Sequence, residues 1–362
     1  MTSTLSSTYF ALGLRRQQDG KTLDVLYPSI EHDPELLKAL GEHFDLKSDI
    51  NQWYGVEAAL FEPLKTLWDK HGGNALLDEL NDSGMGQCYY GDMDLGLIVL
   101  NDGSQTVKTP EEAYFKLHLL SHRVVKPHDV CMDSAFAVLN NVAWTQKGPI
   151  LPADLPRERI RAQLAGEPLV VSHVDKFPYL VNYHIPTGVR IASGAQVRLG
   201  AHLGEGTTVM PAGYVNFNAG TKGHAMIEGR VSAGVFVGDH SDVGGGASIM
   251  GTLSGGNNHV ISIGDNCLLG ANAGAGISLG DGCTIAAGLY VYAGMKIALV
   301  DLEDQPINLS GEKVKPGENI VKASAVSGRN HLLFIQDSRT GQVICKPNAK
   351  TIELNAELHS NN

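Results

Sequence analysis

The sequence predicts a mainly β protein, in which an N-terminal α/β domain precedes a parallel β-helix. Aliphatic residues recur every six positions between Ile185 and Ile297, and 25 of the 42 glycines fall in this window. A period of six residues matches neither the two-residue period of a half-buried strand nor the 3.6-residue period of a helix. Three hexads would form one triangular coil of about 18 residues, with glycine supplying positive φ or close backbone approach at the corners.

The residues before the repeat differ in composition and define a separate domain. Residues 1–183 contain all three tryptophans, so we place the domain boundary near residue 183. Thr109 and Glu112 form a capping-box pattern at the start of one helix. Helices are expected over 33–44, 109–125 and 151–166, and strands over 95–100 and 169–174. No catalytic signature lies in this domain, and we expect it to serve packing, oligomer contacts or one wall of a site.

The repeat itself is expected to fill residues 184–298. Its first run places aliphatic residues at Ile185, Ile191, Val197, Leu203, Val209 and Val215. The frame slips after Ile227, where the next aliphatic residue is Val231, and the polar segment 251–259 interrupts it again. About six coils at roughly 4.8 Å each would make a prism about 30 Å long. Since regular hexads give smooth faces, we expect the functional groups within 216–230 and 241–264, where the repeat is irregular.

The chain after the repeat, residues 299–362, is expected to form a C-terminal extension. Residues 321–347 resemble short strands with a hairpin turn near 336–339. The polar residues that follow are expected to fray.

Composition excludes several classes of function. Twenty-eight basic against 39 acidic residues give a formal charge of −11, which disfavours nucleic acid as a partner. No apolar run approaches the roughly 20 residues of a membrane span, and the N-terminus lacks the apolar core of a signal peptide. The five cysteines show no CxxC spacing and suggest reduced thiols. We therefore expect a cytoplasmic protein with neither a membrane nor a nucleic-acid partner.

The linking segments between hexads carry a family resemblance. The motifs VNFNAG, IEGRVSAGVFVGDHSDVGGGASIMGTLSGG, ISIGDNCLLGAN and AAGLYVYAG, with the later VKASAVSGRN, resemble the tetrahydrodipicolinate N-succinyltransferases. They are most similar to the longer branch of actinobacteria and pseudomonads. The resemblance spans roughly residues 180–335 and is weaker over 1–180. It implies a homotrimer of left-handed β-helices, with active sites between neighbouring prisms.

The resemblance also implies an activity, the transfer of succinyl from succinyl-CoA to the amine of tetrahydrodipicolinate in the diaminopimelate route to lysine. No permanently bound cofactor is expected, and succinyl-CoA is a co-substrate. An amine that attacks a thioester must lose a proton, so a carboxylate or histidine must lie within about 3 Å of it. Glu228, at the frame slip, matches the family's catalytic acidic residue, either as general base or through a transient acyl anhydride. The Gly251 N–H matches the family's oxyanion donor.

The residues expected to bind the co-substrate follow from the same resemblance. They are Arg230, Gly245, Ser248, Ala271, Ala286, Ala287, Gly294, Lys322 and Asn330. Lys322 and Arg329 could supply positive charge to the phosphates of CoA.

One departure from the family concerns metal. Some relatives of the longer branch carry two acidic residues at a cation site near the three-fold axis, where this chain has Ala195 and Ala212. Alanine cannot bind a cation, so no metal is expected there.

Three alternatives rest on the same fold. A histidine-dependent hexapeptide acetyltransferase could use His224 or His259 as its base. A γ-type carbonic anhydrase would need three histidines on zinc, for which His224, His240 and His259 are the candidates. A non-catalytic scaffold would bind no CoA. The flanking segments lack resemblance to the carbonic anhydrase family, and Glu228 with the SDVGGGASIMG segment favours acyl transfer.

Overall fold

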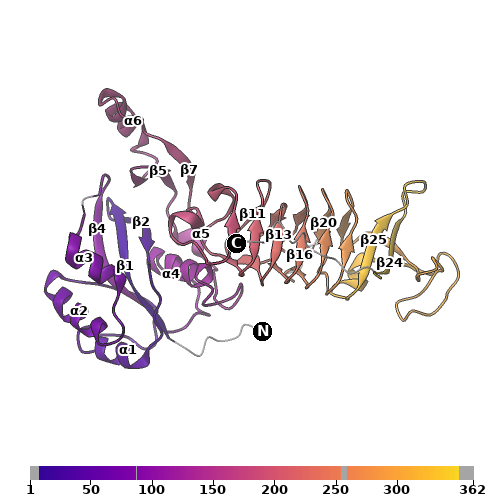
Figure 1. Cartoon of the computed structure of the whole chain (residues 1–362), viewed down its shortest axis with the longest axis horizontal. Coiled ribbons are helices and arrows are strands. Elements are labelled where there is room, and N and C mark those ends of the chain that lie inside the picture. The colour runs from indigo at the N-terminus through magenta and orange to yellow at the C-terminus, as the bar shows by residue number, and fades with distance from the viewer. Residues whose placement is uncertain (1–7, 87, 254–258, 350–362) are drawn as a thin grey trace. The chain divides into compact units, whose positions relative to one another are not determined.

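The computed structural model describes residues 8–86, 88–253 and 259–349 (Figure 1). The chain forms two compact units. The first comprises the chain up to Leu119, with His128–Pro178 and Asn182–His184, and the second comprises Leu120–Pro127, Tyr179–Val181 and the chain from Ile185. Within the described ranges, no helix has the length and apolar character needed to cross a membrane.

The first unit is built on a four-stranded antiparallel sheet in the order β2-β1-β4-β3. Its strands are β1 (Tyr9–Gln18), β2 (Lys21–Leu26), β3 (Gln52–Gly55) and β4 (Asp92–Leu100). Alternate residues of β1, such as Phe10 and Leu12, pack with Leu36, Trp68 and Leu77, one from each of three helices on one side. These helices are α1 (Pro34–Leu40), α2 (Phe61–Asp69) and α3 (Ala75–Ser83).

The remaining elements of this unit include a second, three-stranded sheet in the order β6-β5-β7. They are α4 (Pro110–Ser121), α5 (Ala135–Val138), β5 (Val142–Thr145), β6 (Gly148–Ile150), α6 (Leu155–Leu164) and β7 (Val171–Asp175). Helix α4 lies against β1 and β2, where Glu111 accepts hydrogen bonds from Arg15 and Thr22.

The sequence-based elements of the first unit are confirmed in kind, with shifted ends. The expected helix over 33–44 is α1, which Asp33 caps by accepting from the N–H groups of Glu35 and Leu36. The expected helix over 109–125 is α4, where Thr109 accepts from the Glu112 N–H. Each of the three expected helices is longer than the observed one, because turns or caps take up the flanking residues.

The second unit is a parallel β-helix with three faces, and the hexad prediction is confirmed. The first face contains β8 (Arg190–Ile191), β10 (Thr207–Val209), β13 (Ala225–Ile227), β16 (Ser241–Val243), β19 (Leu268–Leu269) and β21 (Thr284–Ile285). The second contains β11 (Tyr214–Val215), β14 (Arg230–Val231), β17 (Ser248–Ile249), β20 (Gly274–Gly276) and β22 (Tyr290–Tyr292). The third contains β9 (Ala201–Leu203), β12 (Ala219–Thr221), β15 (Phe236–Val237) and β18 (Ser262–Ile263).

The chain runs from the first face to the second and then to the third in each coil. We call the bend between the first and second faces the first corner, that between the second and third the second corner, and that between the third and first the third corner. In-register pairing stacks equivalent residues, so that Val209, Ile227 and Val243 lie on successive strands of the first face. All three are fully buried, which explains the six-residue aliphatic period.

The chain after the repeat continues the prism. Strand β25 (Leu332–Gln336) pairs in parallel with β21, and β26 (Val343–Pro347) pairs with β25 in an antiparallel hairpin. Strand β23 (Lys296–Leu299) pairs with β24 (Ile320–Lys322) and with β26. The expected boundary between residues 298 and 299 thus falls inside a strand. Residues 299–349 belong to the same compact unit as the repeat.

Candidate active site

The frame slip after Ile227 is a shortened first corner. Only Glu228 and Gly229 connect β13 to β14, whereas four residues, 210–213 and 244–247, form the first corner in the coils before and after. The backbone of Glu228 is held on both sides. Its N–H donates to the Val243 carbonyl at 2.8 Å, and its carbonyl accepts from the Gly246 N–H at 3.2 Å. A fixed backbone gives the Glu228 carboxylate a defined position at the irregular point of the prism.

The glycines of the next coil leave room for this carboxylate. A Cβ atom added to Gly245 would lie 3.3 Å from Glu228 Oε2, and one added to Gly244 would lie 2.6 Å from the Leu269 carbonyl. Gly246 has a φ of +70°, which favours glycine. The run of three glycines therefore fits the close approach of neighbouring coils beside the half-buried Glu228.

A second carboxyl, Asp242, lies on the strand next to Glu228. It occupies the middle of β16, opposite Met226 on one side and Leu268 on the other. Its Oδ1 is buried and has no hydrogen-bond partner within the described ranges. Burial, and secondarily the charge of Glu228, raise the pKa of Asp242 to about 6. Sequence reasoning missed Asp242, although an acidic residue at a position where adjacent strands carry Met and Leu is a usable signal.

Four other predicted residues lie along the same first corner. Gly245, Ala271, Ala286 and Ala287 follow Glu228 on successive coils. The corner is linked by backbone hydrogen bonds from Asn272 to Gly245 and from Gly288 to Ala271, each 2.9 Å long. Ala271 and Ala287 are exposed. Their small side chains leave the backbone of this corner accessible to a bound molecule.

Arg230 and Ser248 begin neighbouring strands of the second face, directly after the first corner. The Arg230 guanidinium donates to the Ser248 hydroxyl from Nη2 at 2.7 Å and from Nε at 3.2 Å. Arg230 is exposed, so this hydrogen bond orients a cation without burying it.

The structure also brings together Gly294 and Lys322, which are distant in the sequence. The residues on either side of Gly294, Ala293 and Met295, accept backbone hydrogen bonds from Ser324 and Ala323 at 3.1 and 2.8 Å. Lys322 lies opposite Lys296 in the β23–β24 pair, and both lysines are exposed. Lys296 was not anticipated, because the pairing of β23 with β24 lies outside the hexad pattern.

Gly251 and Asn330 lie at other corners. Gly251 follows β17 at the second corner, where its carbonyl accepts from Ile261 at 3.1 Å, and residues 254–258 of the adjoining segment lie outside the described residues. Asn330 lies at the third corner, where its Oδ1 accepts the Asp281 N–H at 2.9 Å. One chain therefore does not bring Glu228, Gly251 and Asn330 together, and the Asn330 oxygen is used in backbone support.

The three histidines weighed as zinc ligands are also divided. His224 and His240 stack at the third corner with ring centroids 5.1 Å apart. His259 lies at the second corner, where its carbonyl accepts from Leu253. One chain therefore does not bring together the three candidate histidines of the carbonic anhydrase alternative. Ala195 and Ala212 are both exposed.

Comparison with known proteins agrees with the motifs. A family model described as the middle part of tetrahydrodipicolinate N-succinyltransferase matches residues 139–179, and one described as the hexapeptide repeat of succinyl-transferase matches residues 260–293. The first match lies in the N-terminal unit, where the motifs alone gave a weaker resemblance.

Curated relatives extend the similarity over nearly the whole chain. A 2,3,4,5-tetrahydropyridine-2,6-dicarboxylate N-succinyltransferase of Vibrio cholerae is 44% identical, covering 98% of this chain and 99% of that protein. The enzyme of the same name from Pseudomonas aeruginosa is 55% identical over 69% of this chain and 70% of its own length. A Campylobacter jejuni crystal structure, described as a putative 2,3,4,5-tetrahydropyridine-2-carboxylate N-succinyltransferase, superposes with a TM-score of 0.83 at 32% identity, covering 96% of this chain and 94% of that one.

One assignment follows from the hexad prism, from the carboxylate at its shortened corner, and from relatives that match at this identity over nearly the full length. This chain belongs to the tetrahydrodipicolinate N-succinyltransferase family.

Proposed function

We propose that this chain transfers the succinyl group of succinyl-CoA to the amine of tetrahydrodipicolinate, as the names of its relatives describe, in diaminopimelate and lysine biosynthesis. The observation that carries the proposal is the Glu228 carboxylate, half-buried at the shortened first corner beside Gly245. No permanently bound cofactor takes part, and succinyl-CoA is consumed as a co-substrate.

Glu228 is the proton acceptor in this reaction. Hydration of the cyclic imine of tetrahydrodipicolinate first supplies an amine. As this nitrogen attacks the thioester carbonyl, a C–N bond forms and the nitrogen loses a proton to the Glu228 carboxylate. The resulting tetrahedral oxyanion collapses, the C–S bond breaks, and the CoA sulfur takes up the proton that Glu228 accepted. Opening of the hydrated ring then gives the acyclic N-succinyl keto acid. Asp242 lies on the neighbouring strand, and its raised pKa, near 6, means that it can hold a proton beside Glu228 in mildly acidic solution.

The oxyanion requires a donor, for which we propose the Gly251 N–H. Gly251 is at the second corner and Glu228 at the first, so a site that uses both must draw Gly251 from another copy of the chain. This separation supports a homotrimer of left-handed prisms, with each active site between two copies.

The co-substrate is expected to follow the first corner and the second face. Arg230 and Ser248 would contact its polar groups, while Gly245, Ala271, Ala286 and Ala287 would leave room for the pantetheine arm. The exposed pair Lys296 and Lys322, next to Gly294, would attract the phosphates of CoA.

A thiol-release assay tests the proposal, with succinyl-CoA and acetyl-CoA compared as donors and tetrahydrodipicolinate as acceptor. Thiol release that depends on both succinyl-CoA and the acceptor, and that is much slower with acetyl-CoA, is the expected result. Preference for acetyl-CoA would favour the histidine-dependent acetyltransferase. Absence of CoA binding in calorimetry would favour a scaffold.

A further inference from the structure

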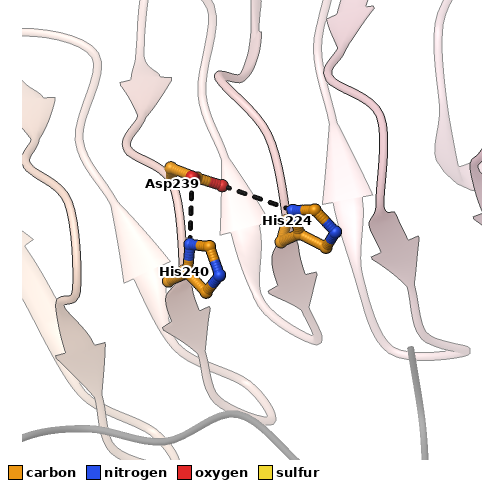
Figure 2. Close-up of side chains that lie close together, drawn as sticks. All are labelled: His224, Asp239 and His240. Atoms are coloured by element: carbon orange, nitrogen blue, oxygen red, sulfur yellow. Dashed lines mark ion pairs between the residues drawn. The ribbon is translucent and has the colours of Figure 1, made fainter. Parts of the chain in front are cut away.

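Two histidines and an aspartate, residue types that can bind metal, lie close together at the third corner of the prism. His224 and His240 occupy this corner in consecutive coils, and Asp239 directly precedes His240 (Figure 2). Figure 2 shows a ring nitrogen of each histidine turned toward the Asp239 carboxylate. The distances are 3.7 Å from His224 Nδ1 to Asp239 Oδ1 and 2.9 Å from His240 Nδ1 to Asp239 Oδ2.

These separations suit a small metal ion. Zinc lies about 2.0–2.2 Å from imidazole nitrogen and carboxylate oxygen, so neighbouring ligand atoms in a tetrahedral site are about 3.3–3.5 Å apart. One ligand atom from each residue lies within 4.8 Å of the other two. The two distances end on different oxygens of Asp239, so a rotation of this carboxylate with small movements of the two rings would place one oxygen and two nitrogens as three of four ligands. A water molecule could take the fourth.

The surroundings favour this arrangement over a chance surface cluster. Asp239 Oδ1 is buried and has no hydrogen-bond partner in the described part of the chain. Two glycines hold space for the group, because a Cβ at Gly206 would lie 2.4 Å from the His224 ring and a Cβ at Gly223 would lie 2.4 Å from Asp239 Oδ1. Both imidazole side chains are about half exposed, so an ion can reach them from solvent.

The donor set also limits the kind of ion. Two imidazole nitrogens and one carboxylate oxygen suit zinc and neighbouring divalent transition metals, whereas calcium and magnesium prefer oxygen ligands. The nearby cation Lys222 is bound to Asp265 at 2.6 Å, which offsets its repulsion of an incoming ion.

We propose that His224, Asp239 and His240 form a binding site for a divalent transition-metal ion, represented by zinc, that joins two consecutive coils of the prism. The site is distinct from the position of Ala195 and Ala212, where no metal is expected. Because its ligands come from two consecutive coils at the third corner, the ion is proposed to stabilise the fold of the chain that binds it.

The test uses the full-length protein after exhaustive dialysis against a chelator. Zinc is titrated into it by calorimetry, and the thermal midpoint is measured with and without zinc. The wild type should bind one zinc ion per chain at this site and melt at a higher temperature with zinc. His224→Ala, His240→Ala and Asp239→Asn should each weaken that binding at least tenfold, since even outer-shell changes at metal sites cost 10–100-fold.

Two further variants separate the loss of a metal ligand from general damage to the fold. His331 has a φ of +55°, as His240 does, and also lies at the third corner, but it follows Asn330 in place of an aspartate. His331→Ala should therefore bind zinc like the wild type. Gly223→Ala keeps all three ligands but displaces Asp239, so it should bind more weakly.

Two results would overturn the proposal. One is a wild-type protein that shows no stoichiometric zinc binding. The other is a His224→Ala/His240→Ala double variant that binds zinc as tightly as the wild type.

Discussion

The first and third corners of the prism use acidic residues in opposite ways. At the third corner two carboxylates support the preceding coil, because Asp265 accepts the Asp239 N–H at 2.7 Å and Asp281 accepts the Asp265 N–H at 2.8 Å. The Asp239 carboxylate is the exception, since it faces His224 and His240. Next to the first corner, in the middle of β16, Asp242 Oδ1 is buried beside Glu228 and has no such donor among the described residues. Carboxylates paired with backbone N–H groups stabilise a fold, whereas carboxyls that lack such partners are available for chemistry.

Among the variants that test this comparison, the largest change in turnover is expected for a substitution of Glu228. Glu228→Gln keeps the volume and a hydrogen-bonding side chain but loses the proton-accepting carboxylate. Turnover should fall by about 10²–10⁴-fold, the usual contribution of general acid–base catalysis, while succinyl-CoA binding changes little. Steady-state thiol release and calorimetry measure the two quantities. More than about a tenth of wild-type turnover in Glu228→Gln would move the base to another group, with His224 and His259 next to examine.

A smaller loss of turnover is expected from Gly245→Ala, which keeps the Glu228 side chain but places a methyl group against its carboxylate. The added Cβ would lie 3.3 Å from Oε2, so the carboxylate must shift by a few tenths of an ångström. We expect turnover to fall by about 10–100-fold, since small misplacements of reacting groups cost this much. Gly55→Ala is the control, because its added Cβ meets no atom within 4 Å. Equal turnover in the two variants would show that the position of Glu228 is unimportant.

At the third corner, the loss of a carboxylate is expected to lower the stability of the fold. Asp265→Ala removes the acceptor of the Asp239 N–H and the partner of Lys222. A lost hydrogen bond of this kind costs about 1 kcal/mol, which lowers the thermal midpoint by about 2–4 °C in a unit of this size. Differential scanning calorimetry measures the shift. A variant that melts with the wild type would argue against the structural role of the carboxylate ladder.

The smallest effect is a pH dependence of stability that has opposite signs for Asp242, beside the first corner, and Asp265, at the third corner. Burial and the charge of Glu228 raise the pKa of Asp242 to about 6, so its contribution to stability is present below the unfolded value, near 4, and is lost as pH rises through about 6. Burial acts to raise the pKa of Asp265, but hydrogen bonds from Lys222 and the Asp239 backbone outweigh it and lower that pKa. The contribution of Asp265 is present above its unfolded value and is lost as pH falls.

Unfolding by denaturant from pH 7 down to about pH 2 checks these signs, because the contribution of Asp265 is lost only below its unfolded value near 4. Asp242→Asn should gain stability relative to the wild type as pH rises toward 7. The deficit of Asp265→Ala should be largest at pH 7 and shrink toward acid. The same sign of pH dependence in both variants would contradict the contrast between the corners.

The sequence was sufficient to predict much of the prism and part of the site. Only buried positions require an aliphatic residue, so its recurrence every six positions indicates one buried strand per hexad. Three hexads then make one coil with three faces. The four-residue step from Ile227 to Val231 marks the shortened corner and singles out Glu228. Gly245 was predicted from the family resemblance alone, and only the structure shows the close approach of neighbouring coils at glycines 244–246.

Other features depend on alignment between coils, which the spacing alone does not give. His224 and His240 lie 16 residues apart, and they stack only because the coil between them is two residues shorter than a regular coil of about 18. The pairing of Lys296 with Lys322 requires a strand that returns after the repeat has ended. The unpartnered oxygen of Asp242 depends on how its neighbours pack, which periodicity does not describe.

A double-mutant cycle on Glu228→Gln and Asp265→Ala, with turnover and thermal midpoint measured on all four proteins, tests the division between the corners most directly. The account predicts that Glu228→Gln lowers turnover alone and Asp265→Ala lowers the midpoint alone. The double variant should then show both losses at their single-variant sizes, as expected for independent sites. A drop in turnover in Asp265→Ala comparable to that in Glu228→Gln would contradict the account.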